Sequence, residues 1–341
     1  MGNIQMSTIS IAVDAMGGDF APEAVVGGLN FALMNLLVDH NISFNIYGKE
    51  DCVLPVLDKY KTVRDNSVFI NTSDVVLAND KPSFALRKRK SSSMWCAIDS
   101  IKTGTSSGVV SCGNTGALMA ISRFVLGTLP NIDRPAICTK VPSKFQDFVL
   151  LDLGANIECS ANSLFQFAIM GGAFAKAVLN IPNPKVALLN VGQEEIKGTG
   201  VIREAFSLLK EVEGKINFCG YVEPKDMVDG KVDVVVTDGF CGNVVLKVSE
   251  SIASTIASIF KESISESIVA KFAGLLLKPR LIKNFSKFNP KLHNGAMFLG
   301  LNGVVVKSHG NSDELAFANA VKVVVNAVIH DINAKIVHEL N

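Results

Sequence analysis

The chain shows no marked excess of either charge, few histidines and no paired cysteine motif. Its 33 lysines and arginines face 32 aspartates and glutamates, which leaves a formal net charge of +1. Proteins whose main ligand is nucleic acid usually carry a strong basic excess, so the composition argues against nucleic acid as a partner. The five histidines have no metal-ligand spacing and no cysteine partners them, so we expect no bound metal.

Long apolar runs are missing as well. No run approaches the roughly 20 residues of a membrane-spanning helix, so we expect any membrane contact to be peripheral. The seven cysteines form no CxxC pair, and nothing at the N-terminus resembles a signal peptide. These features are typical of a reduced, cytoplasmic protein.

Apolar strand-like runs alternate with amphipathic helical stretches along all 341 residues. This alternation predicts an α/β fold with a largely parallel sheet, and we expect one domain over residues 1–341. Helices are expected at 22–38 and 313–339. The expected strands are 8–14, 43–48, 67–71, 107–111, 147–152, 185–191, 232–237 and 302–308.

Residues 262–291 form an amphipathic stretch that stands apart from this alternation. Lysines and one arginine follow or oppose an apolar helical face made of Ile264, Ile268, Phe272, Leu275 and Leu276. Two interpretations remain open. The stretch is either a surface helix packed on the core or on a second subunit, or an interfacial helix on an anionic bilayer.

Four segments share one design: 109–120, 150–160, 188–200 and 234–247. Each leaves an apolar strand through glycine, asparagine or aspartate and then enters a helix. In a parallel sheet such loops lie at the carboxyl edge, where open α/β folds bind ligands. We expect these four loops and the loops at 14–19 and 307–313 to meet at one crevice. Helix N-termini and glycine amides there favour an anion.

Several familiar motifs are excluded. The dinucleotide fingerprint GxGxxG follows no predicted strand. The segment 192–200 is similar to a Walker A loop, but Lys197 precedes Gly198, so the order is reversed. GTSSG at 104–108 precedes its strand, whereas a nucleophile elbow must follow one.

For each of several polar residues in these loops, the sequence allows both a structural and a functional role. Lys197 is either solvated or placed to neutralise phosphate or a developing oxyanion. Asp238 either caps the following helix or accepts a proton. Asn114 and Asn243 are either turn residues or hydrogen-bond donors to a ligand. His309 either packs in its loop or acts as an acid or base.

The basic run RKRK at 87–90 also allows two interpretations. Such a run is usually a solvated face. It can also attract an acidic protein partner electrostatically.

Seven stretches together resemble one family along nearly the whole chain: 11–28, 81–94, 111–120, 150–156, 194–200, 238–247 and 300–313. The blocks DAMGGD and GLNGVVVKSHG are the most specific. On these the chain resembles the bacterial phosphate acyltransferases of phospholipid synthesis. Three positions depart from the family pattern: Cys112 replaces a small residue, Gln193 a glutamate and Thr199 an asparagine.

The resemblance implies a three-layer α/β/α fold related to phosphotransacetylases and isocitrate-dehydrogenase-like enzymes. It also implies a homodimer attached peripherally to the inner face of the cell membrane. The implied reaction moves a long-chain fatty acyl group from acyl carrier protein to inorganic phosphate. The acyl phosphate would then serve phosphatidic acid synthesis through a downstream glycerol-3-phosphate acyltransferase.

Phosphate is already substantially dianionic near neutral pH, since phosphate esters have a second pKa of about 6. It needs positioning more than deprotonation, so a nucleophilic cysteine is unnecessary and Cys112 is expected to be dispensable. The reaction needs an anion cradle, an acyl groove and an oxyanion donor, and we expect no cofactor.

On this basis the expected catalytic residues are Lys197, Asp238, Asn243 and His309. The expected phosphate or substrate contacts are Asp14, Gly17, Gly18, Gly113, Asn114, Thr115, Gly116, Gly154, Asn156, Gly198, Gly239 and Gly242.

The resemblance also favours membrane contact through a helical protrusion at about 255–292. The contacting residues would be Ile268, Phe272, Leu275 and Leu276. Three alternatives remain: a soluble phosphotransacetylase using a short acyl-CoA, a dehydrogenase of the related fold, and a membrane-attached scaffold for the next acyltransferase. A dehydrogenase would need a nicotinamide site, and no such site is identified in the sequence.

Overall fold

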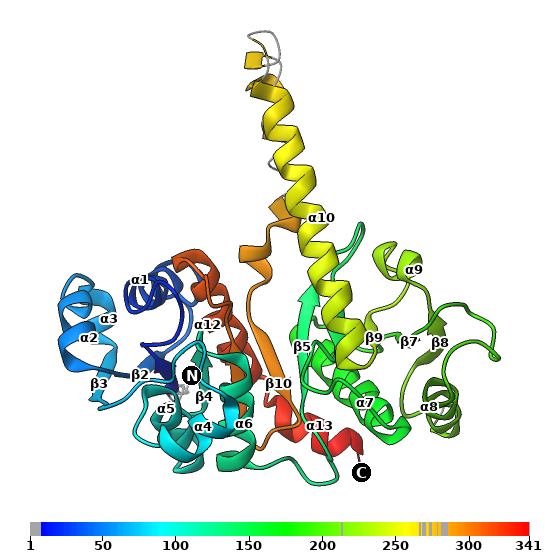
Figure 1. Cartoon of the computed structure of the whole chain (residues 1–341), viewed down its shortest axis with the longest axis horizontal. Coiled ribbons are helices and arrows are strands. Elements are labelled where there is room, and N and C mark those ends of the chain that lie inside the picture. Colours follow the sequence, from blue (N-terminus) through cyan, green and yellow to red (C-terminus); the bar gives the residue numbers. More distant parts are fainter. Residues whose placement is uncertain are drawn as a thin grey trace, which may run out of the picture.

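The structure is a computed structural model, and it describes residues 8–212, 214–265, 267, 271–272, 275–277, 279–280 and 286–340. Within these residues, eleven strands form one sheet in the order β3-β2-β1-β4-β11-β10-β5-β6-β9-β7-β8 (Figure 1). The strands are β1 (Ile9–Asp14), β2 (Ile42–Gly48), β3 (Ser67–Asn71), β4 (Gly108–Ser111), β5 (Ala136–Val141), β6 (Phe148–Leu151), β7 (Val186–Leu189), β8 (Phe218–Val222), β9 (Val234–Val236), β10 (Ala296–Leu299) and β11 (Val304–Lys307).

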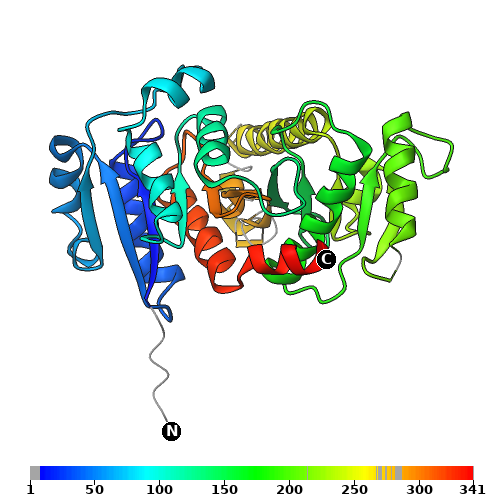
Figure 2. The ribbon, with the colours of Figure 1, turned by 90° about the horizontal axis from the view of Figure 1, so that it is seen from below.

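Helices cover both faces of this sheet, which confirms the predicted three-layer α/β/α fold. Figure 2 shows α5, α6 and α10 on one face and α1, α7 and α12 on the other. The described helices are α1 (Glu23–Phe31), α2 (Glu50–Leu57), α3 (Lys61–Asp65), α4 (Pro82–Lys88), α5 (Ser93–Lys102), α6 (Thr115–Leu126), α7 (Ala161–Val178), α8 (Gly200–Glu211), α9 (Pro224–Val228), α10 (Gly239–Ser265), α12 (Glu314–Ile329) and α13 (Ile332–Leu340).

The core follows from the period-two alternation of the buried strands. Along β1, Ile11 and Val13 pack with α1 and α12, whereas Ala12 faces the opposite layer with α5 and α6. All three side chains are fully buried. Each face of the sheet therefore has its own apolar core, which fixes the register of the strands.

All eight expected strands are present, and β5, β8 and β10 are additional. The long helix expected at 313–339 is divided into α12 and α13, and Asp331 at the break has a φ of 45°. The helix expected at 22–38 ends earlier, since α1 passes into a π-helical turn at Ala32–Leu36.

The two halves of the sheet run in opposite directions. The strands β3, β2, β1, β4 and β11 are mutually parallel, as are β6, β9, β7 and β8. Three antiparallel pairings separate these halves: β11 with β10, β10 with β5, and β5 with β6. The expectation that all six loops meet at one carboxyl edge is therefore wrong. The loops form two clusters, because the carboxyl ends of the halves open at opposite edges.

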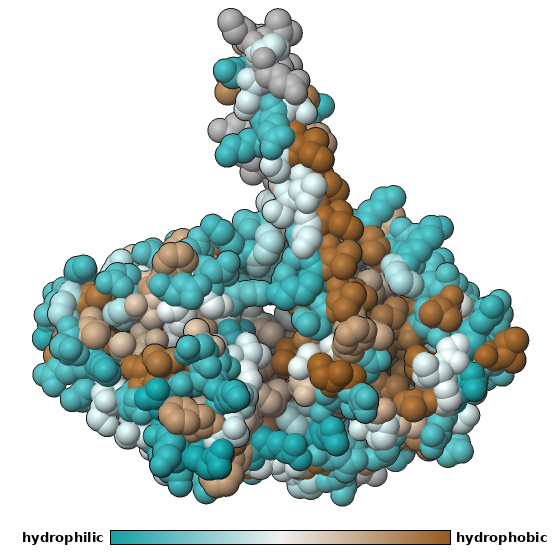
Figure 3. Space-filling model, viewed as in Figure 1, coloured by the Kyte–Doolittle hydropathy of each residue, from teal (hydrophilic) through white to brown (hydrophobic). Residues whose placement is uncertain are grey.

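Helix α10 rises out of the body as a long arm (Figure 1). It has 27 residues, of which only Gly239 and Gly242 are buried. A row of exposed apolar side chains follows it, visible as a brown stripe in Figure 3. No single helix of the described part is both long and apolar enough to cross a membrane, although the bent pair α12–α13 passes that test jointly.

Candidate active site

The first loop cluster lies at the carboxyl ends of β1, β4 and β11, and a buried carboxylate lies at its centre. Asp14 ends β1 and is only 1% exposed. Its two oxygens accept hydrogen bonds from Ser93 Oγ and Ser111 Oγ, both at 2.6 Å, and from Met16 N at 3.3 Å. Burial raises the pKa of Asp14, although these hydrogen bonds and the nearby Lys307 act against the rise.

Glycines bring the three loops of this cluster into contact. A Cβ on Gly17 would lie 2.5 Å from the backbone nitrogen of Gly113. Gly18 has a φ of +100°, and its Cβ would lie 2.7 Å from Cys112 Cβ. The structure thus brings Asp14, Gly17, Gly18 and Gly113 together, as expected. A narrow gap, too small for a water molecule, adjoins them and is lined in part by Cys112, Gly310 and Ser312.

The start of α6 completes this cluster. Asn114 Oδ1 accepts from Ala117 N at 3.0 Å, while its Nδ2 donates to the carbonyl oxygens of Ala78 and Asp80. Its side-chain amide therefore caps α6 and holds the loop that contains Ala78 and Asp80. The amides of Thr115 and Gly116 belong to the first turn of α6, where helix geometry leaves N–H groups available for an anion.

Lys307 at the end of β11 is a cluster residue that the sequence analysis missed. Its Nζ donates to the carbonyl oxygens of Cys112, at 3.3 Å, and Ser308. Burial lowers the pKa of Lys307. Within the described residues no carboxylate forms an ion pair with it, so it is a partly buried cation beside glycine loops. A lysine directly after a buried VVV strand was the available signal.

Cys112 does not have the environment of a catalytic thiol. Its side chain is 5% exposed, and burial raises the pKa of the thiol to about 11. The nucleophilic form of cysteine is the thiolate, which is scarce at neutral pH for such a group. Cys112 serves as a small packing residue beside Gly18.

The second loop cluster lies at the carboxyl ends of β6, β9 and β7, and it also has a buried carboxylate. Asp152 is fully buried and accepts from Ile137 N at 2.8 Å, Ala155 N at 3.1 Å and Asn156 N at 2.7 Å. Burial raises the pKa of Asp152 against these hydrogen bonds. Asn156 Nδ2 donates to Asp152 Oδ2 and to Pro135 O, so its amide has a structural role.

The first turn of α10 rests directly on the Asp152 loop. A Cβ on Gly239 would lie 2.6 Å from Asn156 O, and one on Gly242 would clash with the backbone oxygen of Asp152. At Gly154 the nearest atom to a Cβ would be Asn243 Cβ, at 3.7 Å. The exposed Asn243 side chain therefore stands over Gly154.

Asp238 performs the capping role that one interpretation assigned to it. Its Oδ1 accepts from Cys241 N at 2.8 Å at the start of α10. The second carboxylate oxygen is not used by this cap, and the side chain is partly exposed beside Asn243 and Gly239. The cap and a chemical role are therefore compatible.

Lys197 lies in the loop after β7, next to the second cluster because β7 pairs with β9. Its side chain is exposed and has no ion pair among the described residues. Asn190 Nδ2 donates to the carbonyl of Lys197 at 3.3 Å, and Gly198, with a φ of +86°, packs against Asn190. The loop backbone is anchored while the ammonium remains free.

Both departures in this loop have local partners. Gln193 Nε2 donates to Asp226 Oδ2 at 2.6 Å. Thr199 Oγ1 accepts from Ile202 N at 3.3 Å and caps α8. Both side chains therefore have structural roles, one tying the loop to α9 and the other capping α8.

Helix α10 connects the two clusters. It starts at the second cluster with Gly239, and Glu250 on the same helix reaches the first cluster through His309, with 3.5 Å between Glu250 Oε1 and His309 Nε2. Asn243 and Glu250 are seven residues apart, about 10 Å along one helix face. Lys247 lies between them and pairs with Glu250 at 3.4 Å. A polar row thus leads from Asn243 to His309.

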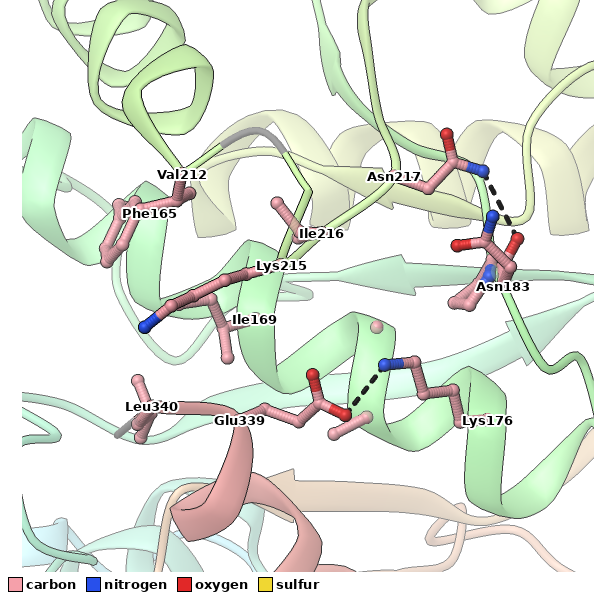
Figure 4. Close-up of a pocket in the computed structure, with 13 residues that line it drawn as sticks. Phe165, Ile169, Lys176, Asn183, Val212, Lys215, Ile216, Asn217, Glu339 and Leu340 are labelled. Atoms are coloured by element: carbon pink, nitrogen blue, oxygen red, sulfur yellow. Dashed lines mark hydrogen bonds and ion pairs between the residues drawn. The ribbon is translucent and has the colours of Figure 1, made fainter.

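A cavity lies away from both clusters (Figure 4). It is bounded by α7, by the segment before β8 and by the end of α13. Phe165, Ile169 and Ile216 form apolar walls, and Lys176 pairs with Glu339 at 2.7 Å. None of the predicted site residues lines it. No group of three or more potential metal ligands occurs in the described chain.

The sheet order and helix layers place the chain in the fold class of the phosphotransacetylases. A phosphotransacetylase from Streptococcus pyogenes aligns with a TM-score of 0.63 at 17% identity, over 94% of each chain. A branched-chain phosphotransacylase from Enterococcus faecalis V583 gives 0.59 at 14% identity, over 94% of this chain and 99% of that one.

Sequence comparison defines the family. Residues 9–335 match the family described as fatty acid synthesis protein. A phosphate acyltransferase of Ehrlichia chaffeensis is 75% identical over 98% of this chain and 100% of its own length. One of Anaplasma phagocytophilum is 54% identical over 100% of this chain and 99% of its own. The chain belongs to this family of phosphate acyltransferases, which confirms the resemblance.

Proposed function

We propose that the protein transfers a long-chain fatty acyl group from acyl carrier protein to inorganic phosphate and releases acyl phosphate. The observation that carries the proposal is the second loop cluster, where the glycine-rich start of α10 packs on the Asp152 loop and the exposed Asn243 and Lys197 side chains have no ion pair among the described residues. Membership of the phosphate acyltransferase family supports it. A phosphate and a thioester need two adjacent sites, one for the anion and one for the developing oxyanion.

In the proposed reaction a phosphate oxygen attacks the thioester carbonyl carbon. A C–O bond forms, the carbonyl oxygen becomes an oxyanion, and the C–S bond then breaks. The sulfur leaves with the electron pair and takes up a proton. Lys197 stabilises charge on the attacking phosphate or the oxyanion, and the free amide of Asn243 donates to that oxyanion.

Asp238 and His309 handle orientation and protons in this proposal. The Asp238 oxygen outside the helix cap orients Lys197 or holds a phosphate proton. His309 lies at the other end of the polar row, where Glu250 holds its ring. It is proposed to supply, relayed along that row, the proton that the departing sulfur takes up. The backbone amides at 154–156 and 239–243 supply the phosphate cradle beside Lys197, and those at 113–116 offer a separate anion site at the first cluster.

We also propose a homodimer formed through α10. Along one face of this helix, Val244, Val248, Ile252, Ile256 and Ile259 are between 42% and 56% exposed. A stripe of this length on a protruding helix needs an apolar partner, and a second copy offers the matching stripe. Ile252→Glu with Ile256→Glu should yield monomers in analytical ultracentrifugation, whereas a dimer that survives both changes would place the interface elsewhere.

The tip of the arm is proposed to touch the anionic inner face of the cell membrane, which keeps the protein cytoplasmic but peripheral. Phe272, Leu275 and Leu276 are 65% to 68% exposed. Ile268, the fourth expected contact, lies outside the described residues. Phe272→Asp with Leu276→Asp should release the protein from anionic vesicles in a flotation assay. Retained binding would assign the tip to another role.

The membrane position would place the product near the glycerol-3-phosphate acyltransferase that consumes it. A scaffold role for that enzyme is separable from catalysis. Lys197→Ala should abolish acyl phosphate formation and leave partner recruitment intact if both roles exist. Production of acetyl phosphate from acetyl-CoA, without activity on acyl carrier protein, would instead favour the short-chain phosphotransacetylase.

A further inference from the structure

Aromatic rings and cations gather on the surface formed by α4, the start of α5 and the end of α6. The rings of Trp95 and Phe124 lie 5.9 Å apart, and Lys90 Nζ lies 5.8 Å from the Trp95 ring. Phe124 is 64% exposed and Phe84 is 43% exposed. We call this surface the basic aromatic patch, and its residues are Phe84, Arg87, Lys88, Lys90, Trp95 and Phe124.

The patch is positively charged because the nearby acidic residues, Asp74 and Asp80, form ion pairs with Arg89 instead of with the exposed cations. Arg89 turns inward, with Nη1 2.7 Å from Asp74 and Nε 3.0 Å from Asp80. Its guanidinium carbon lies 5.4 Å from the Phe84 ring, which fixes that ring between the salt bridges and solvent. Arg87, Lys88 and Lys90 are exposed and form no ion pair among the described residues. Three free cations therefore surround exposed aromatic rings, on a chain whose net charge is only +1.

Hydrogen bonds connect the segments that form the patch to the first loop cluster. Asn114 holds the carbonyls of Ala78 and Asp80 just before α4, and Ser93 at the start of α5 donates to Asp14. Helix α6 begins at the cluster with Thr115 and reaches the patch at Phe124. Nine residues of helix correspond to about 14 Å. A thioester-bearing group carried by a protein docked on the patch would therefore have to extend about this distance to reach the first cluster.

We propose that the basic aromatic patch docks the acidic protein that carries the acyl thioester. This inference rests on the proposed function and identifies the surface through which its donor substrate arrives. Exposed aromatic rings supply desolvated anchors at interfaces, and unpaired cations steer an acidic partner and set its orientation. About 14 Å of α6 separates the patch from the first cluster, so the partner remains at the surface while its acyl-bearing group reaches that cluster.

An acidic protein fits this position better than a lipid surface. Figure 1 shows α4 and α6 at the end of the body away from the tip of α10. A flat bilayer that meets the tip of the arm does not also reach α4. The apolar stripe of α10, and not the patch, is the continuous surface that leads to the tip (Figure 3).

Charge reversal tests the patch. The triple variant Arg87→Glu, Lys88→Glu, Lys90→Glu should raise the KM for a long-chain acyl carrier protein at least tenfold and weaken its salt dependence, with kcat within about twofold. The matched control is Lys59→Glu, Lys61→Glu, Lys322→Glu, which changes the net charge equally at exposed lysines elsewhere. Its KM should stay within about threefold. Phe124→Ala should raise KM and leave the salt dependence unchanged.

The outcomes separate the two proposals. Wild-type protein that makes no acyl phosphate from acyl carrier protein contradicts the proposed function itself. Active wild type with an unchanged KM in the triple variant overturns the patch alone. Loss of binding to anionic vesicles with an unchanged KM would make the patch a membrane surface. If the triple variant folds poorly, the milder set Arg87→Gln, Lys88→Gln, Lys90→Gln should still raise KM at least threefold, and an unchanged KM there also overturns the patch.

Discussion

Glu250 and His309 meet at 3.5 Å, and this contact joins the helix that starts at one loop cluster to the loop of the other. The hydrogen bond from His309 holds the pKa of the Glu250 carboxyl below its ordinary value, with Lys247 adding to the effect against partial burial. The side chain of His309 is 49% exposed and that of Glu250 is 30% exposed. The contact therefore defines geometry between the two halves of the sheet more than it stabilises the fold.

His309→Asn should lower kcat by about 10²-fold, the scale of losing a general acid. Glu250→Gln keeps a hydrogen-bonding group and should cost less than tenfold. Because the pair is half exposed, both variants should unfold within about 1 kcal/mol of wild type in urea. If His309→Asn retains full turnover, the residue is only a packing group of its loop.

Lys197→Ala should reduce turnover by at least ~10²-fold, which is the scale of removing one oxyanion donor. The folded state should be unaffected, because the ammonium has no ion pair among the described residues. Lys210 is an exposed lysine on the following helix that pairs with Glu195 at 3.0 Å, so Lys210→Ala serves as the control and should remain active. Near-normal turnover in Lys197→Ala would remove this residue from the mechanism.

Cys112→Ala should be nearly silent in turnover. The thiol has a pKa of about 11 and is buried against Gly18, so it contributes volume and little chemistry. Wild-type protein treated with iodoacetamide at pH 7 should modify exposed Cys219 and Cys241 well before Cys112, as read by peptide mass spectrometry. A large loss of kcat in Cys112→Ala would point to covalent catalysis.

Gly242→Ala should destabilise the protein by about 1–3 kcal/mol and lower activity, because the new methyl group would clash with the backbone oxygen of Asp152. Gly172→Ala in α7 is the matched control. Its Cβ would meet nothing closer than Val186 Cγ2 at 3.8 Å, so it should be neutral or stabilising by about 0.5–1 kcal/mol. Equal urea midpoints for the two variants would contradict the close approach of α10 to the Asp152 loop.

Asp14 predicts a specific pH dependence of stability. Burial raises its pKa in the folded protein, so the folded state binds this proton at a higher pH than the unfolded chain does. The stability contributed by that proton is fully present below the unfolded pKa and is lost as pH rises through the folded pKa. Relative to Asp14→Asn, wild type should therefore gain unfolding free energy between pH 7 and pH 4. A difference that is constant or reversed would mean that the folded pKa is not raised.

Local patterns in the sequence were sufficient to predict the strands and the glycine loops. Strand-like runs such as 107–111 place a valine on each face of the sheet, and loops such as 113–116 contain glycine and asparagine at the strand ends. The reversal at β10 and β5 could not be predicted in this way, because an antiparallel strand buried on both faces has the same composition as a parallel one. The single crevice was wrong for that reason.

The buried charged groups show a second limit. Asp152 and Lys307 look like ordinary residues at strand ends, and only the packing of other loops around them makes them buried. The caps of Asn114 and Asp238 were foreseen as one of two interpretations, since both residue types favour helix starts. Which partner each side chain finds depends on segments distant in the sequence, such as Ala78 for Asn114.

The most direct test is to incubate the purified protein with inorganic phosphate and acyl carrier protein loaded with a long-chain fatty acyl thioester. The product is then detected by mass spectrometry. We predict acyl phosphate and free carrier-protein thiol in equal amounts, formed by wild type and by Lys210→Ala and at least ~10²-fold more slowly by Lys197→Ala. No acyl phosphate from wild type, with acetyl-CoA converted to acetyl phosphate instead, would contradict the proposed function.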